Sequence, residues 1–176
     1  MSRTHRTYPR NSPDAAARVI AALIAHDGRL DWRELEFFDG VGALQLLGIE
    51  REHFIAVLSC YFRERLAGMA GGCSPSASRM DAQIDAIDDH STQLIVAAML
   101  LYLAEIDGVQ AGESELVRRA WNRWNVTPQM LEREMKIPLA LSRAVFGPGA
   151  FAALTEEDLP RRFDICESAT PADEKA

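Results

Sequence analysis

An apolar run near the middle of the chain constrains the fold most. Residues 94–104, LIVAAMLLYLA, carry no charge and almost no polar side chain. The run is too short to cross a bilayer, because a membrane-spanning helix needs about 20 apolar residues. A helix that is apolar on all sides is a buried one. We therefore predict a buried helix over residues 92–108, at the centre of an all-α domain.

The same order of features occurs twice in the chain. The central run ends at Asp107-Gly108, and an earlier apolar stretch, IAALIA, ends at Asp27-Gly28 after a histidine. Glycine is the usual residue just after the last turn of a helix. Each pair is followed by a short polar loop and a Glu-x-Glu run with two apolar residues, ELEFF (34–38) and ESELV (113–117). This order predicts two similar helical halves.

The domain boundaries follow from this repeat. We place the halves at residues 14–68 and 79–131, joined by a Gly-, Ser- and Pro-rich loop over 69–78. Together they form a helical domain over 13–150, with a bundle of about seven to eight helices. The ends, an arginine-containing arm over 1–12 and an acidic tail over 151–176, are predicted to be flexible.

Start and stop signals predict individual helices. Ser12 before Pro13 and Thr127 before Pro128 each combine a capping hydroxyl with proline at the first helical position. Pro138 should kink or split the second of these helices.

Apolar spacing predicts the remaining helices. The first runs over 31–47 and is closed by Gly48. The second runs over 51–66, with Gly68 after its end, and its inward residues are Phe54, Ile55, Leu58, Phe62 and Leu66. The others are 78–89, capped by Ser78; the central helix, capped by Ser91 or Thr92; and 113–124, with Trp121 and Trp124 in the core and the neighbouring arginines outside.

Composition narrows the function classes. The 176 residues carry a net charge of −7, which argues against a general nucleic-acid binder, since phosphate binding requires a basic surface. The first residues contain no apolar segment typical of a secretory signal, and three widely spaced cysteines fit free thiols in a reducing compartment. We expect a cytoplasmic protein without a membrane span.

The acidic residues around the two Asp-Gly pairs are the first candidate site. If the halves pack about a pseudo-twofold axis, Asp27, Glu34, Asp107 and Glu113 could converge and bind a divalent cation, since hard cations prefer oxygen ligands. Calcium, magnesium, manganese and zinc all stay open, and no other cofactor is expected. The alternative is structural: the aspartates accept hydrogen bonds from loop amides, and the glutamates complete capping boxes.

A second group of acids forms the secondary candidate. Asp85, Asp88 and Asp89 lie close together in sequence and could bind a divalent ion, but such a charge run is typically a solvated helix face. His26, beside Asp27, could add a nitrogen ligand, or it could interact with the negative end of its own helix.

The two Asp-Gly segments resemble the TerB-like family, which includes tellurite-resistance proteins and the N-terminal domains of membrane-anchored DnaJ-type co-chaperones. The segments are IAHDGRLDWRELEFF (24–38) and LAEIDGVQAGESELV (103–117). The first fits the family pattern of Asp-Gly, an apolar residue two positions on and Glu four further. The second departs from it by one residue and has Gln110 at the apolar position.

This resemblance implies a helical bundle with no enzymatic activity, an acidic cation-binding surface and a role in stress-response assemblies. We therefore expect a non-enzymatic binding module with protein partners and a weak divalent-cation site; a homodimer is one open state. Two alternatives stay open: a metal-dependent hydrolytic enzyme that uses the acidic cluster, and a protein-interaction adaptor without a ligand.

Overall fold

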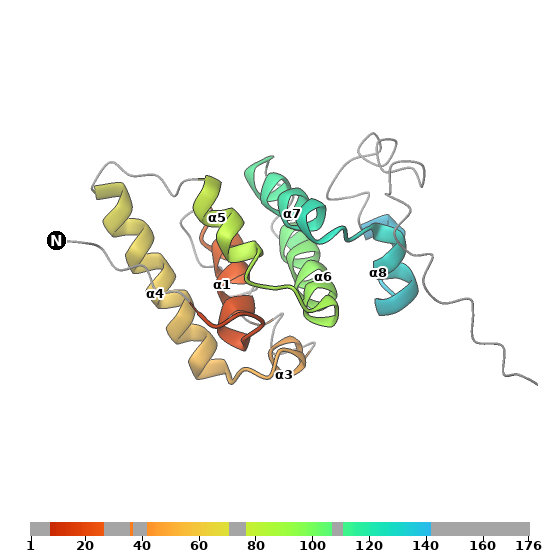
Figure 1. The fold of residues 1–176 in the computed structure, drawn as a ribbon, viewed down its shortest axis with the longest axis horizontal. Helices are drawn as coiled ribbons and strands as arrows, with labels where there is room; N and C mark the ends of the chain where they lie inside the picture. Colours follow the sequence, from red (N-terminus) through yellow and green to blue (C-terminus); the bar gives the residue numbers. More distant parts are fainter. Residues whose placement is uncertain (1–7, 27–35, 37–41, 71–76, 107–110, 142–176) are drawn as a thin grey trace, which may run out of the picture.

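The computed structural model describes residues 8–26, 36, 42–70, 77–106 and 111–141. Every regular element in this part of the chain is an α-helix, and the part contains no strand (Figure 1). The predicted all-α class is confirmed. The helices are α1 (Pro13–Ile24), α3 (Ala43–Leu46), α4 (Arg51–Ala70), α5 (Ala77–Ile84), α6 (His90–Ile106), α7 (Ala111–Trp124) and α8 (Pro128–Met135), and Glu36 is also helical.

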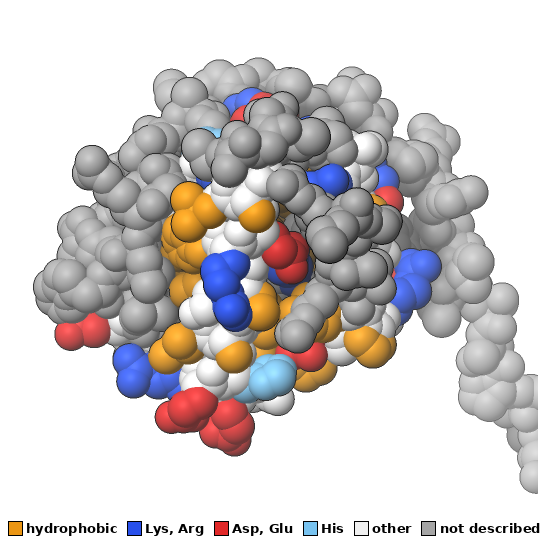
Figure 2. All heavy atoms as spheres, turned by 90° about the vertical axis from the view of Figure 1, so that its left-hand side faces the viewer, with side chains coloured by type: hydrophobic (Ala, Val, Ile, Leu, Met, Phe, Trp, Pro, Cys, Tyr) orange, Lys and Arg blue, Asp and Glu red, His pale blue; other side chains and the backbone are white. Residues whose placement is uncertain are grey.

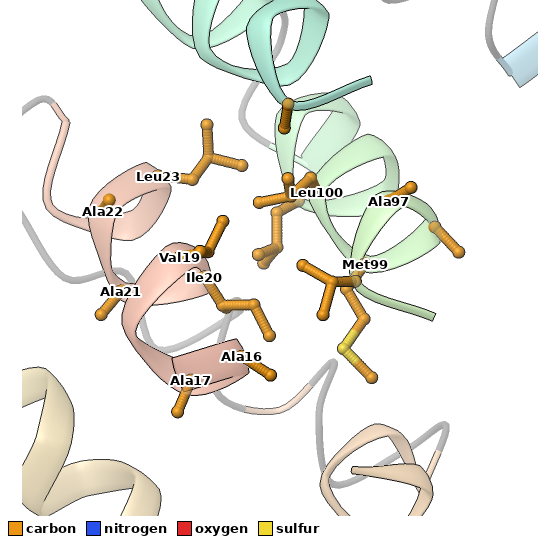
Figure 3. Close-up of a cluster of buried hydrophobic side chains, with 14 of the residues drawn as sticks. Ala16, Ala17, Val19, Ile20, Ala21, Ala22, Leu23, Ala97, Met99 and Leu100 are labelled. Atoms are coloured by element: carbon orange, nitrogen blue, oxygen red, sulfur yellow. The ribbon is translucent and has the colours of Figure 1, made fainter. Parts of the chain in front are cut away.

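The core is built on α1 and α6, which pack directly against each other. Val19, Ile20 and Leu23 of α1 point toward Met99 and Leu100 of α6 (Figure 3). Helix α4 covers the other side of α1, α7 and α8 contact α6, and α5 contacts α1 (Figure 1).

The predicted burial of α6 is confirmed, but α6 is not the only central helix. Val96, Leu100 and Leu101 are fully buried, and ten of the twelve residues of α1 are buried as well. The short side chains of α1, five of them alanines, let four other helices approach it. No helix in the described part is long and apolar enough to cross a membrane.

Both proline-marked helix starts are confirmed. The Ser12 hydroxyl accepts a hydrogen bond from the Ala15 backbone N–H at 3.1 Å, and Pro13 begins α1. The Thr127 hydroxyl accepts one from the Met130 N–H at 3.2 Å, and Pro128 begins α8. Helix α8 ends at Met135, ahead of Pro138, in line with the predicted split.

The predicted helix over 31–47 lies mostly outside the described residues, and its last part is not continuous. Gly42 has φ +63°, in the left-handed region, so α3 starts afresh after it. Gly48, at φ +65°, ends α3 in a Schellman motif, in which the Ile49 N–H reaches back to the Leu44 carbonyl at 3.0 Å.

Helix α4 is longer than predicted and turns a different face inward. It continues past Gly68 to Ala70. The inward face is Phe54, Val57, Leu58 and Tyr61, whereas Ile55 is 37% exposed and Leu66 is 63% exposed. The prediction was right for Phe54 and Leu58 and wrong for Ile55 and Leu66, because α4 has apolar residues on both sides.

The junction between α5 and α6 also differs from the prediction. Helix α5 ends at Ile84 rather than 89, and Ile84 and Ile87 are both buried. Helix α6 begins at His90, and its cap is Asp89 instead of Ser91 or Thr92. The Asp89 carboxylate accepts hydrogen bonds from the Thr92 N–H at 2.8 Å and the Thr92 hydroxyl at 2.7 Å.

Candidate functional site

The N-terminal segment joins the starts of α1 and α6. Asn11, at φ +55°, donates its backbone N–H to the Ala86 carbonyl at 2.8 Å. Its side-chain oxygen accepts hydrogen bonds from the backbone N–H groups of Asp88 at 2.7 Å and Asp89 at 3.0 Å. Residues 8–12 of the arm expected to be flexible are therefore docked on the bundle, with Tyr8 packed against the core.

The two core helices run the same way from this common start. Since α1 and α6 begin side by side and stay in contact, their C-terminal ends point toward the same side of the bundle (Figure 1). An Asp-Gly pair follows each end in the sequence. Asp27, Glu34 and Asp107 lie outside the described residues, and Glu113 lies in α7 with its side chain outside the described part.

The C-terminal end of α1 is held by an arginine from α4. The Arg65 guanidinium donates to the carbonyl of Ala25 and, at 2.5 Å, to that of His26. A cation at this end of a helix interacts favourably with the helix dipole. Arg65 thus interacts with the negative end of α1, a role that the sequence suggested for the His26 side chain. It also fixes the backbone directly before Asp27.

Two acids of α5 and its C-terminal turn, Asp81 and Asp85, are paired with arginines of α7. Arg119 makes a bidentate contact to Asp81, with Nε donating at 2.6 Å and Nη2 at 3.0 Å. Arg123 donates in the same way to Asp85, with Nε at 2.7 Å. The hydrogen bond from Arg119 holds the pKa of the Asp81 carboxyl below its usual value and raises the pKa of Arg119.

The other two acids of the cluster are engaged as well. Asp88 contacts Arg10 at 2.7 Å and accepts a hydrogen bond from the Asn11 amide. Hydrogen bonds from the Thr92 hydroxyl and backbone lower the pKa of Asp89. In the described ranges, no three His, Cys, Asp or Glu side chains come close enough together to hold a metal ion. The cluster is thus an ion-pair and capping surface rather than an open acidic face.

An unpredicted polar group lies inside the core between α1 and α4. Arg18, 4% exposed, forms an ion pair with Glu64, and its guanidinium lies over the Tyr61 ring at 4.5 Å. Burial raises the pKa of Tyr61. The Arg18 Nε and Nη1 atoms are buried and have no hydrogen-bond acceptor in the part of the chain that the structure describes. The only sequence signal was one charge within an otherwise apolar stretch, AAARVIAALIA.

Trp121 and Trp124 lie in the core, as predicted. The Trp121 indole N–H donates to the Ala97 carbonyl at 3.4 Å, and the Trp124 N–H to the Ile84 carbonyl at 3.0 Å. Both residues are at most 6% exposed, so their rings are not available at the surface for stacking on nucleobases.

Comparisons with protein-family models, with curated proteins and with solved structures give no match for this chain. The likeness to the TerB-like family therefore depends on the two Asp-Gly segments alone.

Proposed function

We propose that this chain is a non-enzymatic, TerB-like binding module of a stress-response assembly, which binds a divalent cation where its two halves meet. The ligands proposed are Asp27, Glu34, Asp107 and Glu113. The observation that carries the proposal is the parallel pairing of α1 and α6, the two helices that lead into the Asp-Gly pairs.

The physical chemistry of helix ends supports a cation at this side of the bundle. Unpaired carbonyl groups give the C-terminal end of each helix a partial negative charge. Two such ends directed to one side, each followed by an aspartate, favour a hard cation with oxygen ligands. Arg65 already satisfies part of this charge at α1, which is consistent with weak binding.

The described acids favour a binding role over hydrolysis. The enzyme alternative needs the acidic cluster to hold a catalytic metal, yet Asp81 and Asp85 are paired with arginines and Asp89 caps α6. A carboxylate in such a pair must lose its partner before it can bind a metal ion.

The test is thermal unfolding during titration with calcium, magnesium, manganese or zinc. A cation at one hundred times its dissociation constant should stabilise the folded protein by about 2.7 kcal/mol. Asp27→Asn/Asp107→Asn should abolish this increment, because it removes two charges while side-chain size is kept.

The matched control is Asp85→Asn/Asp88→Asn. It should lower the stability of the metal-free protein, since both carboxylates are ion-paired, and leave the cation increment intact. An absent increment with every ion up to millimolar levels, in a protein that still captures a defined partner, would favour the ligand-free adaptor instead.

A further inference from the structure

The outer face of α4 differs from the other exposed helix faces. Exposed positions on α8 are polar or charged, namely Gln129, Glu132, Arg133 and Glu134. Between Glu52 and Gly68 of α4, His53 is exposed and pairs with Asp14 of α1. The other exposed positions are mostly apolar or small: Ile55, Ala56, Ser59, Arg63, Leu66 and Ala67. Figure 2 looks onto this side of the molecule and shows hydrophobic side chains along the helix. A basic side chain lies among them partway along the helix, and acidic side chains lie at one end.

Four exposed residues form a line along the centre of this face. Glu52, Ala56, Ser59 and Arg63 are separated by four, three and four positions, so they lie on one stripe of the helix. This spacing reads the same in both directions. A second copy of the helix can therefore pack against this stripe in the antiparallel direction. Glu52 then faces Arg63, and Ala56 faces Ser59.

The two charges of the stripe have no ion-pair partner among the described residues. Arg63 turns back onto its own helix, where Nε donates to the Ser59 carbonyl at 3.3 Å and Nη2 lies 3.4 Å from the Cys60 sulfur. By contrast, Arg18, Arg119 and Arg123 each contact a carboxylate. Glu52 and Arg63 are thus available for a second molecule.

We infer that the outer face of α4 binds a second copy of this chain as an antiparallel, two-fold symmetric pair of helices. The axis passes between positions 57 and 58. Glu52 then lies opposite Arg63 of the partner subunit, and the same pair recurs on the other side of the axis. Ala56 lies opposite Ser59 of the partner subunit, and the small side chains allow the helices to approach closely.

The same register places apolar side chains along one edge of the interface. Ile55 comes within one helical turn of Phe62 of the partner subunit, and the symmetric contact repeats it. Leu66 of the partner subunit extends beyond the N-terminal end of α4, toward the neighbouring α3, whose Leu46 is 60% exposed. A closed symmetric pair covers both copies of the apolar face, as cyclic dimers do.

The test is the molar mass of the full chain in solution, measured by sedimentation over a concentration series. The wild type should approach twice the monomer mass. Glu52→Arg places two arginines opposite each other at both ends of the stripe, and Arg63→Glu places two glutamates there. Each single variant should raise the dimer dissociation constant at least tenfold, because like charges brought together across an interface repel.

Charge reversal makes the register itself testable. An equimolar mixture of the two single variants, Glu52→Arg and Arg63→Glu, should form a heterodimer, because acid again faces base at both ends. The double variant Glu52→Arg/Arg63→Glu should form a homodimer for the same reason. Glu132→Arg on the exposed face of α8 is the matched control and should dimerise like wild type. A wild type that stays monomeric throughout, a dimer unaffected by either single variant, or a mixture that stays monomeric would each overturn the inference. This test is independent of the cation titration.

Discussion

Arg18 is the residue that fits its surroundings least well. The other buried residues of its helix are alanines and larger aliphatic residues, and two of its nitrogen atoms have no acceptor among the described residues. An unsatisfied buried donor costs about 1–3 kcal/mol. Glu64 and the face of Tyr61 offset part of this cost. The group therefore orients α1 against α4 more than it stabilises the contact.

Substitution of the two charged partners should have unequal effects. Glu64→Ala should destabilise by about 3 kcal/mol, since it leaves the Arg18 charge buried and unpaired, whereas Arg18→Met should cost less than about 1 kcal/mol because a well-packed apolar side chain replaces the charge. Urea unfolding of both variants and of Arg18→Met/Glu64→Ala measures this. The double variant should be more stable than Glu64→Ala alone. Equal losses of stability in the two single variants that add up in the double variant would contradict this prediction.

At the scale of the helix, the two starts marked by proline were easier to predict than the faces or the other helix ends. Ser12-Pro13 and Thr127-Pro128 are local signals, whose hydroxyl and ring act within one turn, so both starts were right. Helix α4 has apolar residues around most of its circumference, and packing against α1 decides that Tyr61 is inside and Leu66 outside. Periodicity within α4 cannot supply that choice.

The glycine that ends α3 gives a test at this scale. Gly48→Ala should destabilise by about 1–2 kcal/mol, because alanine at φ +65° is strained, even though nothing lies within 4 Å of the added carbon. Gly48→Asn should lose less, since asparagine tolerates the left-handed region. Gly68→Ala, inside α4, is the control: it should raise the free energy of unfolding by up to about 1 kcal/mol, because alanine is the better helix former. Chemical denaturation would contradict the assignment if Gly48→Ala matched wild type.

Across the whole molecule, ion pairs and side-chain hydrogen bonds connect segments that are far apart in sequence. Arg119 and Asp81 are 38 positions apart, and Asn11 and Asp88 are 77 apart. The acidic run suggested a metal ion or solvent, because a single sequence gives no signal of which arginine approaches which aspartate. The Asp-Gly site could be predicted only as a pattern, and its side chains lie outside the described residues.

These pairs predict how stability depends on acid. The folded-state pKa of Asp81 is lowered by Arg119, so its contribution is present above the ordinary aspartate value of about 3.9 and is lost as pH falls through the lowered value. The melting temperature should therefore fall in this acidic range. The Asp81→Asn and Arg119→Gln variants should each have a lower melting temperature than wild type at pH 7, and their melting temperatures should fall less steeply as the pH is lowered. An acid dependence identical to wild type in both variants would show that the pair does not contribute.

The all-round burial of α1 has a consequence for synthesis of the chain. Helix α1 is translated before α6, which begins more than sixty positions after α1 ends. At roughly 5–20 residues per second, the ribosome takes several seconds to supply that partner. Helix α4 becomes available earlier and can cover one side of α1, but the side of α1 that packs against α6 has no partner throughout this interval. The fold thus creates a period in which apolar surface of the emerging chain is exposed and can be bound by chaperones.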